Sequence, residues 1–89
     1  MNLYPIRSVA RLSVHFTNAS HEPADPSTIE LTIRPPNSAE IVTQDVTRDD
    51  TGAYHYDYTV SDIGVHRYKW QGDGDLIAAN AEKVFRGIR

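Results

Sequence analysis

The chain contains no cysteine, and this absence excludes several kinds of chemistry at once. Disulfide bonds, cysteine-ligated zinc and thiol catalysis all require that residue. Small domains in oxidising compartments often depend on a disulfide, so packing alone has to hold this chain together. We therefore expect the protein to be made and folded in a cytoplasm.

Long apolar runs and a basic excess are also missing. No segment approaches the roughly 18 apolar residues needed to span a bilayer, and residues 1–7 lack the apolar core of a secretory signal. The formal net charge is −3, which leaves no excess of lysine and arginine to neutralise phosphates. The sequence thus predicts no membrane partner and no nucleic-acid partner.

The residues that are present suit one folded domain. With 89 residues the chain has room for a single small core, so we predict one domain over residues 1–89. A hydrophobic content of 39% argues against disorder. No nucleophile elbow, phosphate-binding glycine loop or other convergent catalytic motif occurs, and we predict that the protein is not an enzyme.

Alternation of apolar and polar residues predicts seven β-strands. Their expected ranges are 3–9, 11–17, 28–34, 40–46, 54–60, 65–71 and 81–86. Tight turns between short strands favour antiparallel pairing. This count predicts an all-β fold, a seven-stranded antiparallel immunoglobulin-like β-sandwich. In that arrangement the first, second, fourth and fifth strands share one sheet, and the remaining three form the other.

The most informative segment is residues 49–60, in which an Asp-x-Gly turn leads into a strand with a tyrosine at every second position. The next strand repeats the pattern, and such an apolar face has to be buried against a second sheet. The predicted core aromatics are Tyr54, Tyr56, Tyr58, Tyr68 and Trp70. The Tyr54 hydroxyl is expected to bond nearby backbone, as in a tyrosine corner. An exposed tyrosine row would instead favour stacking on sugar rings.

Two polar clusters are candidate ligand sites. His15, His55 and Asp57 would share the outer face of one sheet if their strands pair, and such a set can hold zinc. Nothing in the sequence fixes their register, and exposed histidines on sheets are common. Asp73 and Asp75 lack the remaining ligands of a calcium loop. We therefore predict no metal and no cofactor.

Residues 76–79 are four consecutive apolar residues in a connection between strands. They either cover the open end of the sandwich or form an exposed tip that docks on a partner. For the second case the predicted interface residues are Leu76 and Ile77, together with an exposed edge strand.

The C-terminal half is similar to filamin-type and bacterial immunoglobulin-like repeats. In those repeats an Asp-Gly-x-Tyr-x-Val-x-Tyr segment is followed by a Gly-x-Tyr-x-Val hairpin strand. The matching positions here are Asp50, Gly52, Tyr54, Tyr56, Tyr58, Gly64, His66, Tyr68, Trp70 and Gly72. This resemblance implies the fold but no particular function.

A second resemblance covers more of the chain. Residues 11–17, 24–28 and 32–36, with the Gly-x-Tyr-x-Tyr segment and residues 68–70, resemble short immunoglobulin-like proteins encoded among the structural genes of tailed bacteriophages. This implies a non-enzymatic virion component assembled in the host cytoplasm, either a capsid decoration protein or a head–tail junction protein. Its partners would be other virion proteins of the capsid or neck, contacted by many copies. The alternative is a carbohydrate- or host-surface-binding adhesion module, which exposed aromatic residues would favour.

Overall fold

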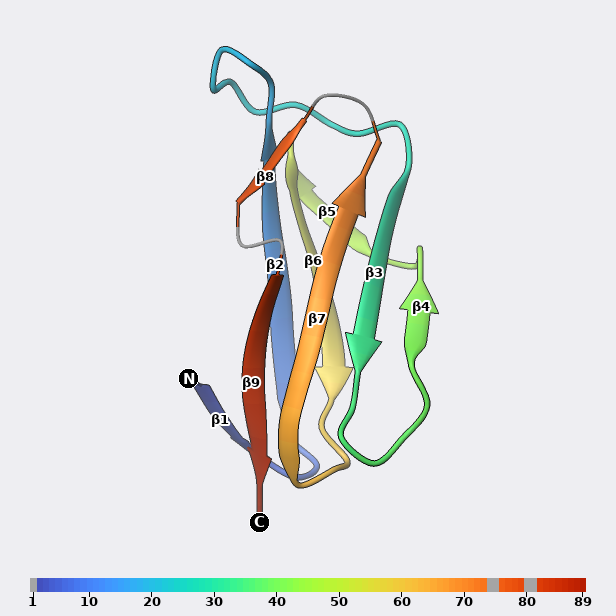
Figure 1. Ribbon diagram of the computed structural model, residues 1–89. Coiled ribbons are helices and arrows are strands. Elements are labelled where there is room, and N and C mark those ends of the chain that lie inside the picture. The colour runs from blue at the N-terminus through green and yellow to red at the C-terminus, as the bar shows by residue number, and fades with distance from the viewer. Residues whose placement is uncertain (1, 74–75, 80–81) are drawn as a thin grey trace.

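The computed structural model describes residues 2–73, 76–79 and 82–89, with the backbone alone for 77–79. Two sheets pack face to face (Figure 1). The five-stranded sheet holds, in spatial order, β1 (Asn2–Pro5), β9 (Glu82–Ile88), β7 (Gly64–Gly72), β3 (Ile29–Arg34) and β4 (Ile41–Thr43). The four-stranded sheet holds β5 (Thr47–Asp50), β6 (Ala53–Thr59), β2 (Val9–Thr17) and β8 (Ile77–Ala79). The predicted all-β sandwich of two sheets is confirmed, and no helix that could span a membrane occurs in the described ranges.

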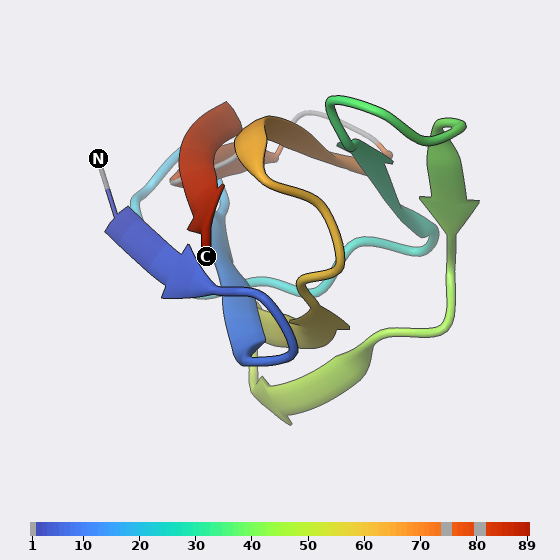
Figure 2. The same cartoon turned by 90° about the horizontal axis from the view of Figure 1, so that it is seen from below.

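The first strand lies on the other sheet from the one predicted. β1 pairs in parallel with β9, from Asn2 opposite Phe85 to Pro5 opposite Ile88, and Figure 2 shows the two strands side by side. Pro5 ends the strand because it cannot donate to a ladder. Arg7 then adopts a positive φ of 76°, which turns the chain across to the four-stranded sheet. The other strand pairs are antiparallel.

The predicted strand over 40–46 is two strands that belong to different sheets. β4 pairs with β3, and β5 pairs with β6, so the connection crosses from one sheet to the other (Figure 2). The Asp45 N–H donates to the Thr43 hydroxyl at 3.0 Å, which turns the chain after β4. Val46 then packs against the core as the chain passes between the sheets.

Residues 77–79 form an edge strand, which neither of the two predicted roles of residues 76–79 included. β8 pairs antiparallel with β2, where Thr17 lies opposite Ile77. The pairing gives the last residues of β2 backbone partners on the side away from β6, and unpaired backbone groups are costly. Leu76 is half-buried and packs against the core.

Alternate residues of β2 supply one half of the core, namely Ala10, Leu12, Val14 and Phe16, and all four are buried. Leu31, Ile33, Trp70 and Phe85 face them from the other sheet. The structure places Tyr54, Tyr58, Tyr68 and Trp70 among the buried residues, with Tyr56 half-buried against them. His66 is also fully buried, with its ring stacked on Phe85 at 4.6 Å between centroids. Aromatic packing therefore fills the interior that a disulfide would otherwise cross-link.

Candidate binding surfaces

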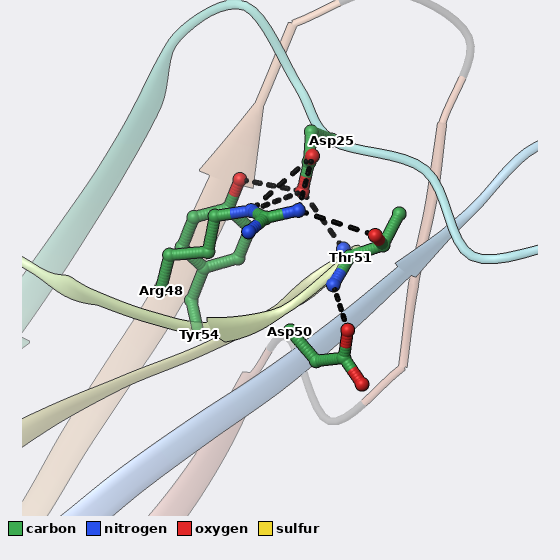
Figure 3. A network of polar contacts seen from close by, with 6 residues as sticks. Asp25, Arg48, Asp50, Thr51 and Tyr54 are labelled. Atoms are coloured by element: carbon green, nitrogen blue, oxygen red, sulfur yellow. Dashed lines mark hydrogen bonds and ion pairs between the residues drawn. The ribbon is translucent and has the colours of Figure 1, made fainter.

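Asp25 is the centre of a polar cluster at one end of the sandwich (Figure 3). Its carboxylate accepts hydrogen bonds from Arg48 Nη2 at 3.0 Å, from the Gly52 N–H at 2.8 Å and from the Tyr54 hydroxyl at 2.9 Å. These bonds, with Arg48 contributing most, lower the pKa of Asp25 to about 2. The donors come from β5, β6 and the turn between them, so the cluster ties the loop after β2 to that hairpin.

The Tyr54 hydroxyl thus differs from the tyrosine-corner prediction. Its acceptor is the side chain of Asp25, 29 residues earlier in the chain, and not nearby backbone. The side chain reaches the end of the sandwich, where the loop over residues 18–28 crosses over it. Burial and the Asp25 hydrogen bond together raise the pKa of Tyr54. The polar groups of the cluster bond to one another, so the cluster stabilises the fold at this end of the sandwich.

Gly52 is required at the turn of this cluster. Its φ is +74°, and a Cβ there would collide with the Phe16 carbonyl oxygen and crowd the Ala24 backbone. The Gly52 carbonyl accepts from the Phe16 N–H at 2.7 Å, and the Phe16 carbonyl accepts from the Ala24 N–H at 3.1 Å. Three segments therefore meet backbone to backbone, an approach that only glycine permits.

Two of the three candidate zinc residues lie close together, because His55 Nε2 is 3.9 Å from an Asp57 oxygen. His15 lies opposite Ala53 on β6, while His55 lies opposite Ser13 on β2. The His55 Nδ1 is 2.7 Å from an Asp49 oxygen. Within the described ranges, no three ligating side chains converge on one point.

Asp57, the third candidate zinc residue, is also bonded to an arginine. It accepts from Arg11 Nε at 2.9 Å, and this hydrogen bond lowers the pKa of Asp57. Asp73, from the candidate calcium segment, accepts from the Thr28 N–H at 3.0 Å. That backbone hydrogen bond lowers the pKa of Asp73. Asp75 lies outside the described residues. Asp57 and Asp73 thus each make a hydrogen bond within the fold.

The structure describes the candidate interface at Leu76 and Ile77 only in part. Part of the Leu76 side chain is already committed to the core, so only the remainder is open to a partner. Ile77 contributes its backbone to the β8 ladder, and its side chain lies outside the described residues. The segment still supplies an edge strand, since β8 borders the four-stranded sheet.

The outer face of the five-stranded sheet carries a concentration of cations that the sequence analysis missed. We call this surface the basic face, centred on Arg34, Arg67, Lys69 and Arg86. Arg67 lies directly opposite Arg34 on β3 and opposite Val84 on β9. A shallow groove of about 820 Å³ crosses the face, and these residues line it: Thr32, Arg34, Arg67, Lys69, Glu82 and Val84. The alternation of side chains along each strand places these cations on the outer face. The register between neighbouring strands brings them close to one another.

All eight aromatic side chains lie within the described residues, and none of them is exposed. Six are buried, while Tyr4 and Tyr56 are half-buried against the core. Exposed apolar side chains are aliphatic instead, such as Leu3 on β1, Val42 on β4 and Val84 on β9, which are 59%, 54% and 38% exposed. The molecule therefore presents charged and aliphatic surface, and no aromatic platform.

Comparison with known proteins identifies the fold and no family. No model of a known protein family matches the sequence, and no curated protein sequence matches it. Among solved structures, the crystal structure of the Lin-41 filamin domain is similar, with a TM-score of 0.76 and 16% sequence identity. The similarity covers 99% of this chain and 84% of that one. The prediction of a filamin-type, immunoglobulin-like β-sandwich is thereby confirmed, while the resemblance to phage proteins stays a prediction.

Proposed function

We propose that the protein is a non-enzymatic structural component of a tailed-phage virion, either a capsid decoration protein or a head–tail junction protein. The observation that supports this most is the location of the aromatic residues. All eight are buried or half-buried against the core, so none is left to stack on a sugar ring. A protein-binding role is favoured over the carbohydrate-binding alternative for that reason.

The polar side chains support a non-catalytic role as well. The best candidate acid–base group, His55, is bonded to Asp49, and Asp57 is bonded to Arg11. The large polar cluster around Asp25 joins two loops. These contacts stabilise the fold, and they leave no aligned nucleophile and base in the described part of the chain.

Adhesion in a particle would come from many weak contacts acting together. A small sandwich offers limited contact area, and repeated copies on a lattice convert modest affinity into durable attachment. Edge strands add a second means of contact, because their outer backbone groups can pair with a partner strand. β4 is such an edge, and its Val42 side chain is 54% exposed.

Mass spectrometry of purified particles tests the proposal. Virions induced from the host that carries the gene should contain this chain through gradient purification, at a stoichiometry of many copies. Its absence from the particles would refute the virion role.

Tagged variants then locate the contact. Val42→Lys should reduce incorporation if the β4 edge is used, whereas Arg11→Gln, on the outer face of the other sheet, should not. The double variant Leu76→Asp with Ile77→Asp tests the β8 edge. Its thermal melt has to be compared with that of the wild type, because Leu76 also packs against the core.

A further inference from the structure

We propose that the basic face is a docking surface for a partner protein that presents carboxylates flanked by aliphatic side chains. The inference rests on the proposed function only in taking the protein to bind another protein.

The basic face holds like charges close together. Arg67 and Arg34 are directly opposite each other on neighbouring strands, an arrangement that destabilises a sheet. Lys69 follows Arg67 two positions along β7, on the same face. Arg86 lies opposite Val65 on β9, diagonal to Arg67. Arg67 is thus surrounded by three cations within about 7–8 Å between backbone positions.

The cations of the basic face form fewer ion pairs than those of the other sheet. On the other sheet, Arg11 bonds Asp57 and Arg48 bonds Asp25. On the basic face, Arg34 bonds Glu40 at 2.8 Å. The remaining cations of β7 and β9 form no ion pair with any described residue, and they are Arg67, Lys69, Lys83 and Arg86. The repulsion between Arg67 and Arg34 is therefore only partly offset, because Glu40 pairs with Arg34 whereas Arg67 has no ion pair among the described residues.

Positive charge exceeds negative charge on the basic face. The basic face carries four cations, Arg34, Arg67, Lys69 and Arg86, against the carboxylates of Glu30, Glu40 and Glu82, although the whole chain has a net charge of −3. A local excess of positive charge on an acidic molecule attracts acidic surfaces and orients their approach. A partner carboxylate at Arg67 would relieve the repulsion that the isolated domain retains.

The composition of the basic face favours a protein partner over a nucleic acid. Glu82 lies opposite Lys69 within the face, and it would repel a phosphate backbone. Aliphatic side chains border the cations, with Val84 beside Arg67 and Val42 opposite Thr32, and both are exposed. A mixed charged and aliphatic surface matches a protein interface, in which apolar contact supplements ion pairs. The overall negative charge also opposes a polyanion.

The test uses purified, isotope-labelled protein and a blocked twelve-residue peptide of three Glu-Val-Glu-Ser repeats. NMR titration should shift amides of β3, β7 and β9 around Arg67, and leave β2 and β6 unchanged. Binding should weaken by about fivefold or more between low and 0.3 M salt, because screening shortens electrostatic reach. A peptide with Lys in place of Glu should not bind.

Substitution at Arg67 separates binding from folding. Arg67→Glu and Arg67→Gln should each weaken peptide binding, by about tenfold or more for the charge reversal, which corresponds to the loss of one strong charge pair. Both should melt at the same temperature as the wild type or higher, because repulsion from Arg34 is removed. Arg11→Gln, on the other sheet, is the matched control and should leave peptide binding unchanged.

Four outcomes would overturn the proposal. The first is the absence of shifts at millimolar peptide, or shifts confined to the other sheet. The second is tighter binding of a twelve-nucleotide oligo-dT, which would make the partner a nucleic acid. A third is concentration-dependent shifts without peptide, which would make the partner a second copy. A lower melting temperature for both Arg67 variants would show that Arg67 stabilises the monomer. All of these are measured in solution, so they are independent of whether virions contain the chain.

Discussion

The Tyr54 hydroxyl donates a hydrogen bond to the Asp25 carboxylate across 2.9 Å, which joins β6 to the loop that follows β2. The same carboxylate accepts from Arg48 and from the backbone of Gly52. One side chain in a long loop thus fixes the position of the β5–β6 hairpin. In a chain without cysteine, this cluster takes over the cross-linking of distant segments at that end of the sandwich.

Removing the Tyr54 hydroxyl should weaken this link. Tyr54→Phe keeps the ring in the core and loses one hydrogen bond, so the free energy of unfolding should fall by about 1 kcal/mol. For a domain of this size, that corresponds to a drop in melting temperature of about 4–8 °C. Tyr56→Phe removes a hydroxyl from the same strand without touching Asp25, and it should melt close to the wild type. Equal melting of all three proteins would show that the bond contributes nothing.

Stability should depend on pH through Asp25. Its pKa is about 2 in the folded protein, below the ordinary value of 3.8, so the unfolded chain takes up the proton first. The contribution of Asp25 is complete above about pH 5, declines as the pH falls towards 2, and vanishes below that. Asp25→Asn removes this contribution at every pH. Thermal melts from pH 7 to pH 2 should therefore show the gap between wild type and variant closing in acid. A gap that stays constant would contradict the assignment.

The Asp-x-Gly turn should not tolerate a side chain. Gly52→Ala places a Cβ against the Phe16 carbonyl at a φ of +74°, and we expect a loss of about 1–3 kcal/mol in the free energy of unfolding. Chemical denaturation measures it. Ala53→Gly, the reverse exchange one residue later in the chain, should cost no more than about 1 kcal/mol. A larger loss at Ala53 than at Gly52 would argue against a steric requirement at the turn.

Leu76 should contribute to stability. Because it is half-buried against the core, Leu76→Ala should reduce the free energy of unfolding by about 1–2 kcal/mol, less than for a fully buried leucine. Leu3→Ala, at a position that is 59% exposed, should change it by about 0.5 kcal/mol or less. Identical denaturation curves for the two variants would show that Leu76 is free for a partner after all.

The period of the tyrosines was enough to predict the sandwich and its aromatic interior. Position along a strand decides which way a side chain points, so the parity of Tyr54 and Trp70 could be read directly from the sequence. The sheet to which an element belongs could not be read in this way. β1 and β4 lie on the other sheet from the one predicted, because a left-handed Arg7 and the turn after Thr43 redirect the chain. Neither residue type indicates such a turn in the sequence.

The positions of the candidate site residues relative to one another depend on the register between paired strands, which the sequence does not determine. Arg67 lies opposite Arg34, and Glu30 lies opposite Gln71, and alternation of side chains along a strand does not determine either pair. His15 and His55 were placed on the correct face, yet the ladder sets them against Ala53 and Ser13. A shift of one or two residues between strands rearranges every such pair. The hydrogen bond between Asp25 and Tyr54 joins residues that are far apart in the sequence, and no local sequence pattern predicts it.

The parallel pairing of β1 with β9 has a mechanical consequence. Asn2 lies beside Phe85 and Pro5 beside Ile88, so the two ends of the chain leave this ladder in opposite directions (Figure 1). A pulling force applied through the two ends would slide the strands past each other and load all their hydrogen bonds at once. An antiparallel terminal pair would open one bond at a time. The domain is therefore built to resist tension along its long axis.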